Sequence, residues 1–289
     1  MSYNYLPLDK KQLHFDQVKN LIDFGQLVSI TFDAHEQILK CREYLDKKIN
    51  NGSLIDGINV YHNEKIVMAE IEQFQLDLLI ANAKKTDNEQ PIAIVKLMLM
   101  LKIKSLGYGY SGVAIDTVKR LMEMYNNDMV PVVCSDILLG DKFALSQLAL
   151  PLIGLGEVYF KGQKIPAIKA MEFFDWQPLK LKSKEALALI NGTEFTTAYG
   201  LFCLKNSEEL VFNADGIAVT SVMVNAIKNA YNYVLQVFMK EANTVTDYPL
   251  IFPDKDLIIS TGESTNKHLM LALQFLNFAI SQLPIKNVN

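Results

Sequence analysis

The cysteine and histidine side chains of this sequence are too few and too scattered for a metal or disulfide site. Cys41, Cys134 and Cys203 are far apart, and no CxxC pair is present. The four histidines show no zinc-binding spacing with them. Neither His62 nor His268 has an obvious partner in the sequence, so we expect both to be structural or exposed. We therefore expect no metal and a reduced, cytoplasmic protein.

The composition excludes several classes of protein. The 289 residues contain 28 basic and 32 acidic side chains, so the chain lacks the basic surface of a nucleic-acid or anionic-membrane binder. Hydrophobic residues make up 50% of the chain and charged residues 21%, which excludes disordered and collagen-like classes. The start has no apolar signal core, and the apolar stretch from Phe143 to Leu155 is interrupted by Pro151. We therefore expect no nucleic-acid or membrane partner.

Helical periodicity dominates the chain, so helices must position its functional side chains. Asp33 and Glu36 form a capping-box pattern at the start of one helix. Pro91 suits the first turn of another helix, and Pro151 is expected to bend a buried one. The predicted helices span residues 33–48, 64–83, 91–106, 116–125, 142–154, 183–190, 195–204, 217–242 and 266–283.

The only convincing strand pattern is a small β-hairpin. It comprises Val158–Phe160 and Lys164–Pro166, joined by a turn that contains Gly162. Glycine and proline number only 14 and 9, which also disfavours a sheet-rich protein. Long helices with short connections predict a mainly α, bundle-like fold that forms one continuous structure without a linker.

Several segments resemble, in the same order, motifs of the aromatic amino acid ammonia-lyases, the family of histidine and phenylalanine/tyrosine lyases. Residues 104–113 resemble the family's N-S-L-A-x-G-x-S-G-V, and residues 134–147 resemble G-S-V-G-A-S-G-D-L-A-P-L-A-H. Residues 154–162 are similar to the family's G-x-G-E-A and the turn that follows it. Residues 178–193 resemble P-L-x-L-x-x-K-E-G-L-A-L-I-N-G-T, and residues 241–252 resemble E-x-N-x-V-T-D-N-P-L-x-F.

This resemblance implies a mainly α-helical fold of the ammonia-lyase/aspartase type, in which a central bundle assembles into tetramers with shared active sites. It divides the chain into an N-terminal lyase-like helical domain, residues 1–190, and a partial central helical bundle, residues 191–289. The chain ends soon after the segment that resembles the central helices, so we expect a bundle truncated at its C-terminus. The connection between Thr193 and Phe212 is also much shorter than in the family.

The family's cofactor raises a chemical conflict with this sequence. Its methylidene-imidazolone forms when an Ala-Ser-Gly tripeptide cyclises and the serine loses water. Leu138, Leu139 and Gly140 occupy the matching positions here. Leu139 has no leaving group on its β-carbon, so we expect that this cofactor cannot form and that the protein has none. We expect Leu138 and Leu139 to be buried structural residues instead.

Ser135 is an alternative source of the hydroxyl that the cofactor requires. Its use would need a four-residue slip in the alignment with the family. The slip would also place Asp136 where a flexible glycine helps the ring to close. We therefore interpret Ser135 as an ordinary loop serine.

Most other positions that match the family's active site carry a different residue. Asp56 replaces the catalytic tyrosine, and Asn82 replaces a histidine. Residues 212–218 lack the family's glutamine, tyrosine and carboxylate-binding arginine, and residues 261–266 lack an asparagine and a histidine. Asn191, in the Asn-Gly-Thr motif, is unchanged. We expect the former pocket to be lined by Asn82, Leu138, Leu139, Gly140, Asn191, Phe212 and Glu263.

The helix-packing motifs resemble the family while the reacting groups differ, which favours a degenerate homologue without ammonia-lyase activity. Such a protein would act as a scaffold or partner subunit, in a homo-oligomer or in a hetero-oligomer with a full-length lyase relative. A shortened bundle would expose apolar residues to that partner, unless all of them belong to the internal core. These residues are Val237, Phe238, Leu271, Leu273 and Phe278.

The alternative is an enzyme with cofactor-independent chemistry in the former pocket. Asp56 and Asp215 are its candidate catalytic residues, and Glu263 is a further carboxylate at a family site position. Two carboxylates in an apolar pocket can have separated pKa values and act as acid and base. An isomerase or dehydratase acting on an aryl or polyene acid would fit. Each carboxylate could equally be solvated, and Lys104 and Lys142 could equally be surface lysines.

The contents of the pocket distinguish these hypotheses. An enzyme would bring together the polar side chains of Asp56, Asn82, Asn191 and Asp215. A scaffold protein would instead fill the pocket with Leu138, Leu139, Phe143 and Phe212. A third hypothesis is ligand binding without turnover, in an apolar slot lined by Phe212, Tyr61 and Tyr248.

Overall fold

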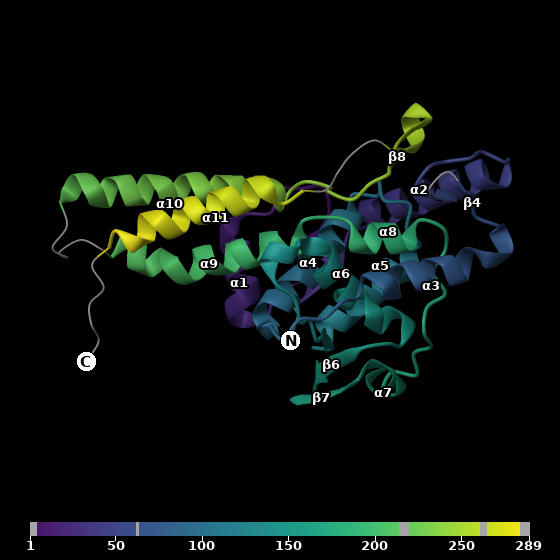
Figure 1. The fold of residues 1–289 in the computed structure, drawn as a ribbon, viewed down its shortest axis with the longest axis horizontal. Helices are drawn as coiled ribbons and strands as arrows, with labels where there is room; N and C mark the ends of the chain where they lie inside the picture. The colour runs from purple at the N-terminus through teal and green to yellow at the C-terminus, as the bar shows by residue number, and fades with distance from the viewer. Residues whose placement is uncertain (1–4, 62–63, 214–219, 261–264, 284–289) are drawn as a thin grey trace.

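The computed structural model describes residues 5–61, 64–213, 220–260 and 265–283. The described chain is mainly helical, as predicted, with a broad head from which an arm of long helices extends (Figure 1). The head contains the helices α1 (Phe15–Phe24), α2 (Phe32–Asn50), α3 (Ile71–Asn82), α4 (Ile92–Gly107), α5 (Ile115–Asn126), α6 (Asp141–Ala149), α7 (Ala167–Glu172) and α8 (Glu185–Ile190). The arm comprises α9 (Glu194–Phe212), α10 (Ser221–Glu241) and α11 (Lys267–Ser281).

Helix α4 forms the centre of the head and is buried on nearly every side. Its sequence is apolar all around the helix, as expected for a helix enclosed by others. Two lysines within it are also buried. The Lys102 ammonium donates to the backbone oxygen of Asn191 at 2.8 Å, and that of Lys104 donates to Asp9 and Lys11 oxygens at 3.0 and 2.9 Å. Lys104 is therefore a structural residue and not a surface lysine, and burial lowers its pKa to about 8.

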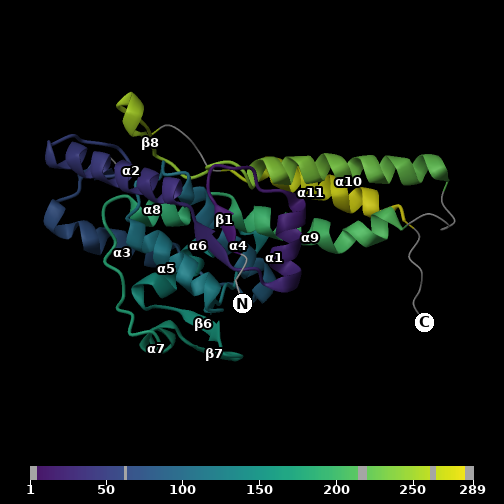
Figure 2. The same cartoon turned by 180° about the vertical axis from the view of Figure 1, so that it is seen from behind.

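The three helices of the arm lie side by side, and Figure 2 shows the same arrangement from behind. The ring of Phe238 on α10 packs directly against Gly200 on α9. A Cβ atom on Gly200 would lie only 2.1 Å from Cε1 of that ring, so this contact requires glycine. The Tyr231 hydroxyl also donates to the Leu204 backbone oxygen at 3.1 Å. No helix in the described part of the chain is long and apolar enough to cross a bilayer.

Short strands surround the helices of the head. The predicted hairpin is confirmed as β6 (Glu157–Phe160) and β7 (Gln163–Pro166), with Val158 opposite Ile165. Strand β5 (Val130–Pro131), which was not predicted, adds a third strand to this sheet. The other pairs are parallel β1 (Leu6–Leu8) with β2 (Val28–Ile30), antiparallel β3 (Val60–Tyr61) with β4 (Glu64–Lys65), and antiparallel β8 (Leu250–Phe252) with β9 (Leu257–Ile259).

Helices α1 and α7 were not predicted, and several helix boundaries differ from the prediction. Thr31, not Asp33, caps α2, because its hydroxyl accepts a hydrogen bond from the Ala34 N–H at 3.2 Å. The helix predicted from residue 64 begins at Ile71, because β4 and the 3₁₀ turn η1 (Met68–Glu70) precede it. Helix α9 continues to Phe212, beyond the predicted end at 204.

The buried helix predicted over residues 142–154 is shorter than expected, and it ends before Pro151 instead of bending at it. Helix α6 ends at Ala149, and the 3₁₀ turn η3 (Leu150–Ile153) that follows contains Pro151. A proline has no N–H for the α-helical ladder, so the chain tightens into this turn. Two further 3₁₀ turns are η2 (Ile137–Leu139) and η4 (Pro253–Lys255).

Candidate functional site

A cavity of about 320 Å³ lies where several separate segments of the head meet. It is lined by Asp56, Gly57, Tyr61, Lys142, Leu187, Asn191, Tyr248, Pro249 and Ser260. Two of the site residues predicted from the sequence, Asp56 and Asn191, are therefore brought together. Tyr61 and Tyr248 of the expected apolar slot also line it, whereas Phe212 does not.

The loop that carries Asp56 is shaped by Asn59. The Asn59 side-chain oxygen accepts from the Ile55 N–H at 2.8 Å, and the side-chain amide donates to the Ser53 backbone oxygen at 2.8 Å. Gly57 adopts a φ of +74°, which suits glycine, and even a Cβ atom there would lie 3.2 Å from Pro249. The loop thus presses against the opposite wall while the Asp56 side chain remains exposed at the cavity rim.

The opposite wall is held by a buried ion pair. The Lys184 ammonium lies 2.5 Å from the Asp247 carboxylate, and both side chains are fully buried. The Ser111 hydroxyl donates to the same carboxylate at 2.8 Å. Burial lowers the pKa of Lys184, and the negative charge of Asp247 opposes that shift. The pair fixes the segment before Tyr248 against the start of α8.

Asn191 completes this wall at the C-terminal end of α8. Its side-chain amide donates to the Tyr248 backbone oxygen at 3.2 Å, and the side chain is buried. Its own backbone oxygen accepts from Lys102. Asn191 therefore joins α8 to the 247–249 segment and also presents polar atoms at the cavity wall.

Lys142, the second residue of α6, supplies the cavity with a cation. Its side chain is half-buried, and burial lowers its pKa. Asp56 lines the same cavity, but no ion pair joins these two residues in the described structure. The sequence did not distinguish Lys142 from a surface lysine, and only the folded arrangement places it beside Asn191.

The prediction that Leu138 and Leu139 are buried is wrong. Their side chains are 78% and 52% exposed, in the turn η2. The Asp136 carboxylate accepts from the Leu138 N–H at 2.8 Å and caps this turn, and Gly140 ends it with a φ of +86°. The short turn projects both leucines outward, so neither of them fills the cavity.

The other predicted pocket residues do not converge on the cavity. Asn82, on α3, donates its amide hydrogen bond to the Leu78 oxygen of the same helix at 2.7 Å. Phe212 ends α9 and packs edge-on against Tyr231, with ring centroids 5.4 Å apart. Phe143 is half-buried and does not line the cavity. Asp215 and Glu263, like His62, lie outside the described residues.

A buried aspartate that was not predicted lies directly after Gly140. The two oxygens of Asp141 accept from the Thr196 N–H and hydroxyl, at 2.7 and 2.8 Å. The Asn266 amide donates to the same hydroxyl at 2.9 Å. Burial raises the pKa of Asp141 to about 6. This network ties α6 to α9 and α11, and the G-D pair in the 134–147 segment was the sequence signal for it.

Ser135 is fully buried, although its neighbours Cys134 and Asp136 are half-buried. Its N–H donates to the Asn88 oxygen at 2.9 Å, and its neighbour Cys134 forms an antiparallel β-bridge with Glu89. Asp136 continues this extended backbone, with φ −120° and ψ 138°. The Ser135 hydroxyl has no hydrogen-bond partner among the described residues.

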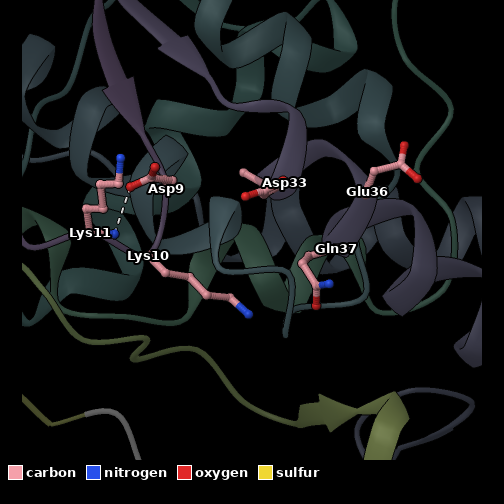
Figure 3. Close-up of a pocket in the computed structure, with 7 residues that line it drawn as sticks. Asp9, Lys10, Lys11, Asp33, Glu36 and Gln37 are labelled. Carbon is pink, nitrogen blue, oxygen red and sulfur yellow. Dashed lines mark hydrogen bonds between the residues drawn. The ribbon is translucent and has the colours of Figure 1, made fainter.

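A second hollow, of about 410 Å³, lies on the surface beside β1 and α2 (Figure 3). Asp9, Lys10 and Lys11 line one side of it and Asp33 and Glu36 the other, and the Lys11 N–H donates to the Asp9 carboxylate at 2.7 Å. It contains none of the predicted site residues. In the described parts of the chain, no three His, Cys, Asp or Glu side chains cluster as a metal site would require, and Cys41, Cys134 and Cys203 are free.

Comparisons with known proteins agree with the resemblance in the sequence. The sequence profile of the family described as "Aromatic amino acid lyase" matches residues 13–226. The chain is 26% identical to the histidine ammonia-lyase of Geobacillus sp. (strain WCH70), over 94% of this chain and 66% of that protein. It is 28% identical to the histidine ammonia-lyase of Bacillus subtilis (strain 168), over 93% of this chain and 66% of that protein.

The fold is also that of solved structures whose names describe ammonia-lyases and aminomutases. The histidine ammonia-lyase of Trypanosoma cruzi matches with a TM-score of 0.87 and 23% identity, over 95% of this chain and 64% of that one. The phenylalanine aminomutase of Pantoea agglomerans matches with a TM-score of 0.88 and 18% identity, over 95% and 69%. The chain spans between 62% and 69% of the length of the curated relatives that it matches.

Proposed function

Because this chain belongs to the aromatic amino acid lyase family, we propose that it is a member without ammonia-lyase activity. The single observation that carries the proposal is Leu139. This residue stands where the family's cofactor needs a serine, and an alkyl side chain offers no oxygen to eliminate.

The neighbouring residues do not fit the cofactor either. Ser135 has the hydroxyl, but the backbone from Cys134 to Asp136 is extended and bridged to Glu89. A five-membered ring from three consecutive residues needs a tight turn, so this segment disfavours cyclisation. We therefore assign no step to a backbone-derived electrophile, and we propose that the protein has no cofactor.

The same turn supports a role as a scaffold or partner subunit. Leu138 and Leu139 form an exposed apolar pair, and Leu271 and Phe278 on α11 are 68% and 65% exposed. We propose that these surfaces pack against another subunit, either a second copy or a full-length lyase relative, in the cytoplasm. The bundle from residue 191 onward would provide the main interface, and the cavity would be shared between this part and residues 1–190.

An absorbance assay tests the loss of lyase activity. The chain is incubated with histidine, phenylalanine or tyrosine, and formation of a conjugated acrylate is followed in the ultraviolet. We expect no product above the uncatalysed rate. The matched control is the double variant Leu138→Ala/Leu139→Ser, which restores the Ala-Ser-Gly sequence. Enzymatic product from the natural chain would contradict the proposal, whatever the control does.

A second candidate function is acid/base chemistry without a cofactor, of the isomerase or dehydratase type, on an aryl or polyene acid. It is supported by Asp56, Lys142 and Asn191 lining one cavity. The exposure of Asp56 weighs against it, because such chemistry is favoured by a site that excludes water. Isomerisation or hydration of such acids that is lost in Asp56→Asn would favour this candidate over the scaffold role.

A further inference from the structure

Lys142 differs from the other inward-facing lysines of the described residues. Lys102 and Lys104 donate hydrogen bonds to backbone oxygens, and Lys184 is paired with the buried Asp247. No described carboxylate, backbone oxygen or aromatic ring contacts the ammonium group of Lys142. Burial alone accounts for its lowered pKa, in agreement with the lack of a described acidic neighbour.

We infer that the cavity binds a small organic monocarboxylate, with the ligand's carboxylate paired to the ammonium group of Lys142. A half-buried ammonium has lost part of its hydration, and the described residues offer it no partner in exchange. An anion in the cavity would supply that partner through a charge-assisted hydrogen bond. Ligand binding at Lys142 is independent of the loss of lyase activity, because it involves no cofactor.

The remaining walls indicate the body of the ligand. Leu187 and Pro249 are buried and apolar, and the half-buried rings of Tyr61 and Tyr248 lie on the same cavity. Since a water molecule occupies about 30 Å³ in the liquid, about 320 Å³ offers room for a ligand of roughly ten non-hydrogen atoms. The walls therefore favour a carboxylate with an apolar body of several carbon atoms.

Asp56 at the rim sets a limit on the ligand's charge. Its carboxylate lines the same cavity as Lys142, so the two formal charges there cancel. A ligand with one negative charge would reach Lys142 while its apolar end faces the rim. A second carboxylate at that end would be repelled by Asp56, which gives the site a preference for monoanions.

Calorimetric titration of the whole chain with acetate, hexanoate and inorganic phosphate at neutral pH tests the site. We expect hexanoate to bind more tightly than acetate or phosphate. Lys142→Met should weaken hexanoate binding by about 10- to 100-fold, the usual value of a hydrogen bond to a charged group. Lys142→Arg, which keeps the charge, should retain most of the affinity. Lys119→Met, an exposed lysine on α5, is the matched control and should change nothing.

The preference for monoanions is tested with adipate, which carries a second carboxylate at the far end of a six-carbon chain. We expect adipate to bind more weakly than hexanoate, and Asp56→Asn to reduce that difference by up to about five-fold. Thermal unfolding of each variant shows that it is folded. The inference is overturned if the natural chain does not bind hexanoate saturably, if folded Lys142→Met binds it equally well, or if phosphate and hexanoate bind alike.

Discussion

At the scale of single residues, Asp141 makes the stability of the protein depend on pH. Its native pKa of about 6 lies above the ordinary value of 3.8, so the native state holds its proton more tightly than the unfolded chain does. Stability therefore falls as pH rises from about 4 to about 6, and the corresponding free energy is about 3 kcal/mol. Above about pH 6 the Asp141 carboxylate is charged in both states, so its contribution to the pH dependence of stability ends there.

Asp141→Asn should remove this dependence, because the amide matches the protonated carboxyl in shape and has no charge. Its oxygen can accept from the Thr196 N–H, and its NH₂ group can donate to the Thr196 hydroxyl. Urea unfolding between pH 4 and 7 should show a flatter profile for this variant than for the natural chain. Asp116→Asn, at an exposed aspartate of α5, is the control. Equal slopes for Asp141→Asn and the natural chain would refute the assignment.

The residues of the site were only partly predictable. The alignment of motifs placed Asp56 and Asn191 in one pocket, and both line the cavity. Lys142 was missed, because its lack of a partner depends on what α8 and the 247–249 segment bring near it. Leu138 and Leu139 were misjudged because side-chain polarity predicts burial only on average, whereas a capped 3₁₀ turn decides where they point.

At the scale of elements, the packing of α9 against α10 depends on Gly200. Gly200→Ala should lower the free energy of unfolding by about 1–3 kcal/mol, because the new methyl group would overlap the Phe238 ring. Gly107→Ala is the matched control, because its methyl group would lie 3.6 Å from the Leu8 oxygen, an ordinary contact. That variant should be neutral or slightly stabilising, since alanine favours helices over glycine. Urea unfolding midpoints compare the two.

The double variant Gly200→Ala/Phe238→Leu shows whether overlap with the Phe238 ring causes the loss of stability. If the overlap with Phe238 produces the loss, then Phe238→Leu should cost less in the Gly200→Ala background than in the natural chain. Additive losses, or equal midpoints for Gly200→Ala and Gly107→Ala, would mean that the α9–α10 contact tolerates a methyl group.

Helices and strands were predicted best where a long pattern of apolar residues lies within the element itself. The α4 segment carries both its proline start and its apolar run, so its bounds were nearly right. The parallel pair of β1 and β2 was missed, because three-residue strands show no alternation and their pairing partner lies about twenty residues away. The extension of α9 to Phe212 reflects packing against α10 and α11. The residues of the α9 segment by themselves do not reveal this packing.

At the scale of the whole molecule, the arm offers apolar surface to a partner. Phe278 and Leu271 are exposed on α11, whereas Phe238, which was expected to share that surface, is fully buried in the arm. Val237 and Leu273 are half-buried. The expected apolar surface is therefore divided between the internal core and the outer face of the helices.

Phe278→Glu should weaken assembly without unfolding the chain, because its ring is already 65% exposed. Size-exclusion chromatography with light scattering should give a multiple of the monomer mass for the natural chain and a lower mass for this variant. Phe173→Glu is the control, because Phe173 is 62% exposed and directly follows α7, which lies away from the arm (Figure 1). A natural chain that remains a monomer, alone and when mixed with a full-length lyase relative, would contradict the subunit role.

The buried pair of Lys184 and Asp247 has a consequence for how this fold can change over evolutionary time. The pair, together with the amide of Asn191, holds the cavity walls in place without using Asp56 or Lys142. Substitutions at those two positions can therefore alter the charge of the cavity at little cost to the framework. A fold built in this way can lose one chemistry and acquire another ligand while its shape persists.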